Sequence, residues 1–83
     1  MAKRLIKCVG DRLRHMDPNR WEGVPVTFKT HWNSENNEID IKHCILVHDA
    51  VEREFNVDID DRKTLLQSVE DCFHFLMSIH TAV

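Results

Sequence analysis

The side chains best suited to chemistry in this sequence are three cysteines and six histidines. Cys44 and His48 stand four residues apart, a spacing that would put a thiolate and an imidazole on one face of a helix, where zinc could bind them. Cys72 and His74 are two residues apart and would diverge on a helix. No four such residues have the spacing of a familiar zinc site, and Cys44 and Cys72 fall at apolar positions of helical periods. A free thiol there behaves as a small apolar side chain, so we expect both cysteines in the core.

A catalytic relay is the second kind of chemistry to consider. Cys44, His48 and Asp49 could be drawn as thiol, base and orienting carboxylate. Adjacent helix residues point about 100° apart, however, so His48 and Asp49 would not form an oriented pair. The sequence also has no glycine-rich phosphate loop and no nucleophile elbow. We therefore expect a protein that is not an enzyme.

Charge is distributed unevenly along the chain. Residues 1–30 hold seven Lys and Arg against three Asp and Glu, whereas residues 31–83 hold four against eleven. A basic first segment could contact RNA or anionic lipid, while an acidic body would repel a phosphate backbone. For each block, a solvated surface is the alternative interpretation. The basic residues around the first segment are Lys3, Arg4, Lys7, Arg12, Arg14 and Arg20.

Length and cysteine usage limit the class of protein. A chain of 83 residues suits one small domain, residues 1–83. An odd number of cysteines without a CxxC pair argues against a secreted disulfide framework and for a reducing compartment. The longest apolar run, residues 44–47, is too short for a membrane span. The opening residues are basic and amphipathic, as transit peptides are, but the same stripe also fits a first core helix.

Three substantial helices would position these residues. Apolar residues at helical spacing predict the first over residues 3–16, and Asp17-Pro18 ends it, because the residue before proline is pushed out of the α region. Asp40 is a good N-cap for the second helix, which we expect to run to Phe55. The apolar stripes of these two helices are Leu5, Ile6, Val9, Leu13 and Met16, then Ile41, Cys44, Ile45, His48, Val51 and Phe55.

The third long helix follows a capping box. Ser68 and Asp71 have the S-x-x-D spacing in which a hydroxyl and a carboxylate satisfy free amides at a helix start. We expect this helix to continue to about residue 80. Before it, residues 60–66 are expected to form one or two helical turns, with Leu65 and Leu66 facing inward.

The first connection is unusually long for so small a domain. Residues 17–37 show no clear periodicity, and loops of this length are uncommon in compact folds. We expect an ordered loop that crosses the core and is held there by apolar side chains. These side chains are Trp21, Val24, Val26, Phe28 and Trp32.

The order of these elements resembles the acyl carrier protein family. In that family the second helix ends Glu-Glu-Phe-x-(Ile/Val)-x-Ile and the fourth begins Thr-Val-x-Asp; AVEREFNVDIDD and LLQSVEDCFHFL are similar to both. The MDPNRW segment, Phe28 and Trp32 also resemble the family's first turn and loop. The resemblance implies an all-α, acyl-carrier-like four-helix bundle with three main helices, one short helix and a long first loop. The matching residues are Glu52, Glu54, Phe55, Val57, Ile59, Ser68, Val69, Asp71 and Phe75.

The departure from the family lies at its attachment site. Counting back from Phe55 places the family's Asp-Ser-Leu on Asp40, Ile41 and Lys42. The family's serine carries 4'-phosphopantetheine through a phosphodiester, which needs a hydroxyl that Ile41 lacks. Ser34 offers the nearby alternative hydroxyl, although it stands seven residues earlier than the expected position. The resemblance therefore implies the fold but no prosthetic group, and we expect Ile41 to pack in the core or at an interface.

The resemblance implies a structural subunit or adaptor. Mitochondrial members of the family bind short helical, basic proteins of the Leu-Tyr-Arg type within larger assemblies. We expect such a role here, in mitochondria or otherwise in the cytoplasm, and no secretion. Acidic residues of the second helix and its exit would steer a basic partner, although Lys42 and Arg53 interrupt them. The expected contact residues are Asp40, Ile41, Asp49, Glu52, Asp58, Asp60 and Asp61.

Two other functions stay open at this point. The first is an active acyl carrier for fatty acid synthesis, with 4'-phosphopantetheine on Ser34. The second is a subunit that contacts RNA through its basic first helix.

Overall fold

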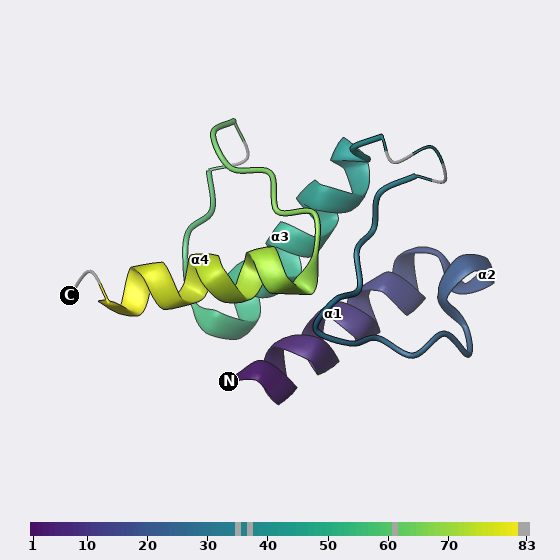
Figure 1. The fold of residues 1–83 in the computed structure, drawn as a ribbon, viewed down its shortest axis with the longest axis horizontal. Coiled ribbons are helices and arrows are strands. Elements are labelled where there is room, and N and C mark those ends of the chain that lie inside the picture. The colour runs from purple at the N-terminus through teal and green to yellow at the C-terminus, as the bar shows by residue number, and fades with distance from the viewer. Residues whose placement is uncertain (35, 37, 61, 82–83) are drawn as a thin grey trace.

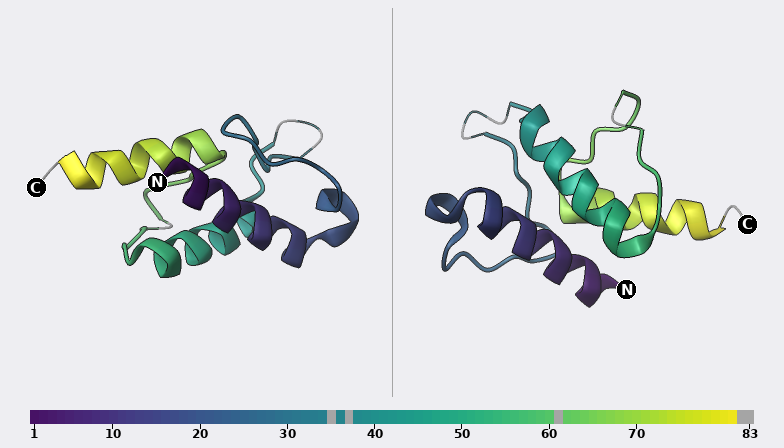
Figure 2. Two further views of the ribbon diagram at one scale, coloured as in Figure 1. Left: turned by 90° about the horizontal axis from the view of Figure 1, so that it is seen from below. Right: turned by 180° about the vertical axis from the view of Figure 1, so that it is seen from behind.

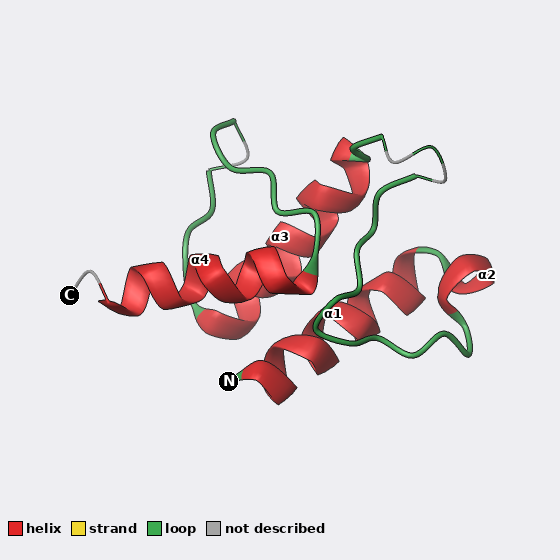
Figure 3. Cartoon of the chain, viewed as in Figure 1, coloured by secondary structure: helices red, strands yellow, loops and turns green. Residues whose placement is uncertain are grey.

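The computed structural model describes residues 1–34, 36, 38–60 and 62–81. These residues form four helices, α1 (Ala2–Met16), α2 (Pro18–Trp21), α3 (Ile41–Phe55) and α4 (Val69–Thr81), and they contain no strand (Figure 1, Figure 3). An isolated antiparallel bridge joins His31 to Ser68. The all-α class and the positions of the three long helices are confirmed.

Helix α1 packs antiparallel against α3. The Arg4 guanidinium lies 2.7 Å from the Glu54 carboxylate at one end of the pair, and Arg12 lies 3.4 Å from Asp49 further along. Helix α1 also contacts α4, so it joins the two other long helices, as Figure 2 shows from below. The face of α1 that enters the core carries Leu5, Val9 and Leu13, at the four-residue spacing of one helical stripe.

The short helix lies at a different place from the one predicted. Residues 60–66 are expected to contain it, but the fourth helix is α2, inside the predicted first loop. Asp17 caps α2 by accepting the Arg20 N–H at 3.3 Å, and Pro18 stands at its first turn, where no amide is needed. Near the expected position, the N–H of Thr64 donates to Asp60 O at 2.8 Å and closes a single turn. Residue 61 lies outside the described residues.

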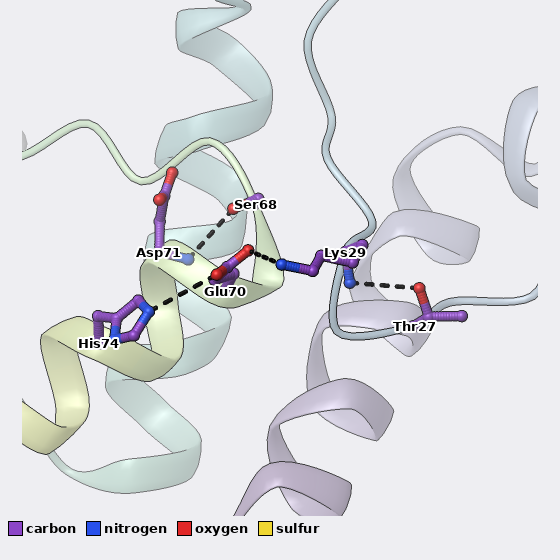
Figure 4. A network of polar contacts seen from close by, with 6 residues as sticks. All are labelled: Thr27, Lys29, Ser68, Glu70, Asp71 and His74. Atoms are coloured by element: carbon purple, nitrogen blue, oxygen red, sulfur yellow. Dashed lines mark hydrogen bonds and ion pairs between the residues drawn. The ribbon is translucent and has the colours of Figure 1, made fainter.

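The first loop crosses the core and docks on the start of α4. Lys29 Nζ lies 2.9 Å from Glu70 Oε2 (Figure 4). The N–H of Val69 donates to Thr30 O at 3.0 Å. In the capping box, the Asp71 N–H donates to Ser68 Oγ at 3.1 Å, as predicted. The loop therefore holds the N-terminal turn of α4 against the rest of the fold.

Trp32 anchors this crossing in the centre of the core. Its side chain is fully buried, and its Nε1–H donates to Leu66 O at 3.0 Å. The Leu66 side chain is buried as predicted, whereas Leu65 is 39% exposed and does not face inward. The bond orients Leu66 because the carbonyl must point at the indole. The residues of the core are Leu5, Val9, Leu13, Trp21, Trp32, Cys44, Val47, Val51, Ile59, Leu66, Val69, Cys72 and Leu76.

The Trp32 hydrogen bond can be tested against a tryptophan that lacks one. Trp21 is also buried, but its Nε1 has no hydrogen-bond partner among the described residues. We expect Trp32→Phe to lower the free energy of unfolding by about 1–3 kcal/mol more than Trp21→Phe, because an unpaired buried carbonyl costs about that much. Urea denaturation of both variants measures the difference. Equal losses would contradict the proposed importance of the bond.

Candidate partner-binding site

Asp40 builds the N-terminus of α3. Its Oδ1 accepts the His43 N–H at 3.1 Å, and its Oδ2 lies 2.8 Å from His43 Nδ1. The hydrogen bond from the His43 backbone is the main cause that lowers the pKa of Asp40, with the His43 side chain adding to it. The N-cap predicted at Asp40 is therefore present, and the carboxylate is held at the helix start.

Ile41 projects from the first turn of α3 into solvent. Its side chain is 57% exposed, and the neighbouring Ile39 and Ile45 are 45% and 43% exposed. The expectation that Ile41 packs in the core is therefore wrong, and so is the inward position expected for Ile45. The reason is that the buried stripe of α3 is centred on Cys44, Val47 and Val51, so Ile41 and Ile45 lie at its uncovered edge. Sequence reasoning missed Ile45 as a surface residue, because its four-residue spacing from Ile41 does not tell which edge of the helix is covered.

The predicted acidic residues do not form one patch. Asp40 lies at the start of α3, whereas Asp58 and Asp60 follow its end, and a helix of 15 residues separates them by about 22 Å. Asp58 and Asp60 are exposed, and the Arg62 N–H donates to Asp60 Oδ1 at 3.0 Å. Asp61 lies outside the described residues.

The two predicted contact carboxylates within α3, Asp49 and Glu52, are engaged inside the fold. Asp49 lies 3.4 Å from both Arg12 and Arg53. Glu52 Oε2 accepts the Ile59 N–H at 3.3 Å and so holds the segment that leaves the helix. These contacts leave the apolar residues, more than the acidic ones, as the distinctive feature of the outer face of α3.

The four arginines of α1 and α2 likewise have partners within the molecule. Arg4 pairs with Glu54 and its guanidinium lies 4.7 Å from the Phe55 ring centroid. Arg20 Nη2 donates to Asn33 O at 2.7 Å. The remaining contacts join Arg12 to Asp49, and Arg14 to Asp11 and the Val24 carbonyl. Lys3 and Lys7 are exposed.

Three of the residues considered for metal binding or catalysis are held in the core, whereas His74 is exposed and Asp49 is half-buried. Cys44, His48 and Cys72 are fully buried, and the Leu66 N–H donates to His48 Nε2 at 3.2 Å. Burial raises the pKa of Cys44, and it raises the pKa of Cys72 to about 12, which opposes thiolate formation. Asp49 faces Arg12 instead of His48. Within the described ranges, no group of three His, Cys, Asp or Glu side chains could hold a metal ion.

Ser34 belongs to a loop that bonds to itself. Its Oγ accepts the Glu38 N–H at 3.2 Å, and its own N–H donates to Glu38 O at 3.0 Å. The hydroxyl is half-buried and does not stand at a helix start, where the family's serine is expected.

An open groove of about 570 Å³ runs between α1 and α3. Its lining pairs the basic Arg12 and Arg53 with the acidic Asp11 and Glu54. Since these charges balance, the groove does not select an ion of either sign.

Comparison with known proteins assigns the chain to no family. No protein-family model matches the chain, and no curated protein matches its sequence. Among the helices described, none is both long and apolar enough to cross a membrane.

The N-cap of α3 gives a pH-dependent test. Because the folded-state pKa of Asp40 lies below its ordinary value, the ionised carboxylate stabilises the fold at neutral pH. This contribution is lost as the pH falls through that lowered pKa. We expect Asp40→Ala to lower the free energy of unfolding by about 1 kcal/mol at neutral pH, with the difference from the native chain shrinking in acid.

The matched control is Asp40→Asn, which keeps a side-chain acceptor at the cap at every pH. Its loss at neutral pH should be smaller than that of Asp40→Ala. Urea denaturation at a series of pH values measures all three chains. A gap between the native chain and Asp40→Ala that stays constant into acid would contradict the assignment.

Proposed function

We propose that this protein is a non-catalytic, acyl-carrier-like structural subunit or adaptor. It binds a helical partner protein within a larger assembly and carries no prosthetic group. The single observation that carries the proposal is Ile41, which stands where the resembled family has its modified serine and is 57% exposed. An isoleucine cannot form the phosphodiester, but it can be buried by another protein.

The partner is a basic, amphipathic helix. Its apolar residues cover Ile41 and Ile45 on the outer face of α3, and its basic residues approach Asp58 and Asp60 beyond the helix end. Burying one isoleucine contributes about 2 kcal/mol to such a contact, and the exposed carboxylates add orientation more than affinity. The family resemblance adds that the partner is of the Leu-Tyr-Arg type and that the assembly is mitochondrial.

The internal contacts of the charged residues support this choice over the alternatives. Four of the six arginines and lysines first considered for RNA contact α3, α1 or the first loop, namely Arg4, Arg12, Arg14 and Arg20. The Ser34 hydroxyl accepts a hydrogen bond within its own loop. Neither arrangement favours a role in RNA binding or acyl transfer.

The absence of carrier chemistry is tested by restoring the hydroxyl. Incubation with a phosphopantetheinyl transferase and coenzyme A should leave the native chain at its bare mass. The variant Ile41→Ser should gain the mass of one phosphopantetheine, because a serine then follows Asp40 at a helix start. Intact-mass spectrometry reads both results. A modified native chain would contradict the proposal, and an unmodified Ile41→Ser would remove its support from the family resemblance.

Partner binding is tested with one variant of α3 and a control outside it. In affinity purification from the native source, the native chain should retain a specific basic helical protein, and Ile41→Asp should lose it. The control is Val24→Asp, which also places a carboxylate at an exposed apolar position but lies in the first loop, away from the proposed contact residues. Retention of the same proteins by the native chain and by Ile41→Asp would contradict the proposed site.

A further inference from the structure

We propose that α3 also pairs with α3 of a second copy of the chain, antiparallel and about a two-fold axis near Ile45. The pairing uses the outer face of α3, and it does not depend on the existence of a different partner. Seen from behind in Figure 2, α3 lies in front of α4, and no described helix crosses its outer face.

The outer face of α3 has a repeating spacing. Four residues lie on one side of this helix because they follow one another at steps of three, one and three residues. They are Lys42, Ile45, Leu46 and Asp49. Lys42 and Ile45 are exposed, Leu46 is half-buried, and the Asp49 side chain is 45% exposed. Along the helix this face therefore runs from a positive charge through two apolar residues to a negative charge.

This order is self-complementary in an antiparallel pair. A two-fold axis between positions 45 and 46 sets Lys42 opposite Asp49 of the second copy, and the reverse pair forms on the other side. At the centre, Ile45 then lies opposite Leu46 of the second copy, and Leu46 lies opposite its Ile45. A parallel pair would instead set lysine against lysine and aspartate against aspartate. Charge complementarity therefore selects the antiparallel register.

Asp49 can pair with a lysine of the second copy while it keeps its ion pairs with Arg12 and Arg53. Its present ion pairs with Arg12 and Arg53 are long, at 3.4 Å each, and the Arg53 side chain is 76% exposed. Lys42 is exposed, and no described residue pairs with it. A carboxylate can accept hydrogen bonds from several donors at once, so a second lysine completes a small alternating network.

The size of the contact sets its strength. Helix α3 has 15 residues and offers one face about 22 Å long and about 10 Å wide. This area of roughly 220 Å² is well below the roughly 800 Å² per partner of a stable interface. The pair is therefore reversible and depends on concentration. It covers Ile45, so a different partner that binds Ile41 and Ile45 must displace the second copy.

The first experiment is sedimentation of the purified full chain over a wide range of concentration. The native chain should shift from monomer towards dimer as the concentration rises. Lys42→Glu alone and Asp49→Lys alone should stay monomeric, because each sets like charges opposite one another. An equimolar mixture of the two variants should dimerise, since every opposed pair in the mixed dimer is then of opposite sign. A native chain that stays monomeric throughout, or a mixture that does no better than its components, would overturn the inference.

Asp49→Lys also removes the ion pair between Asp49 and Arg12 of α1 and could disturb the fold, so a second experiment leaves Asp49 unchanged. Ile45→Cys places a thiol near the axis, where two copies come within disulfide reach. Arg53→Cys is the matched control, because the axis holds its two copies roughly 22 Å apart along the helices. Mild oxidation should link Ile45→Cys into a dimer much faster than Arg53→Cys. Equal rates would indicate random collision and overturn the inference.

These outcomes are separable from those of the partner experiment. A monomeric chain that still retains a helical partner would overturn the self-pairing and leave the proposed function standing. A chain that dimerises but retains no partner would support the self-pairing and overturn the proposed function.

Discussion

The fold depends on how one buried peptide segment, Leu66–Gln67, finds hydrogen-bond partners. The Leu66 N–H donates to His48 Nε2 at 3.2 Å, and Leu66 O accepts the Trp32 indole N–H at 3.0 Å. Gln67 O accepts the Trp32 backbone N–H at 3.1 Å, and the Gln67 N–H donates to Asp71 Oδ2 at 3.0 Å. The segment lies outside any helix, so three side chains and the Trp32 backbone N–H supply the hydrogen bonds that regular secondary structure would otherwise provide. By doing so they join α3, the first loop and α4 at one point.

Around that junction, ion pairs join α1 to α3, and apolar side chains are left exposed on the outer face of α3. Two arginines of α1 pair with carboxylates of α3, Arg4 with Glu54 and Arg12 with Asp49, so α3 neutralises part of the basic charge of α1. What the inner contacts leave on the outside of α3 is a short apolar surface around Ile41 and Ile45, flanked by Lys42 and Asp49. Both the proposed partner helix and the proposed second copy use that surface.

Local signals were enough to predict the long helices. The four-residue spacing of Leu5, Val9 and Leu13, the Asp40 cap and the Ser68 capping box all act within one or two turns, and each is present. Helix α2 has only four residues and no period to detect, so it could not be separated from the surrounding loop. The exposure of Ile45 depends on which edge of its helix is covered, and that is decided by residues far away in the sequence. The Arg12–Asp49 pair, 37 residues apart, has the same origin.

The Trp32 hydrogen bond has a consequence for how the chain folds. It joins residues 34 apart in the sequence, whereas the helices around it need only local contacts. Helical turns can form within about a microsecond, but this bond requires a long loop to close first, with an entropy cost that grows slowly with loop length. Loop closure is therefore part of folding at the middle of the chain, as it is for the α1–α3 contacts, which join residues 37 to 50 apart.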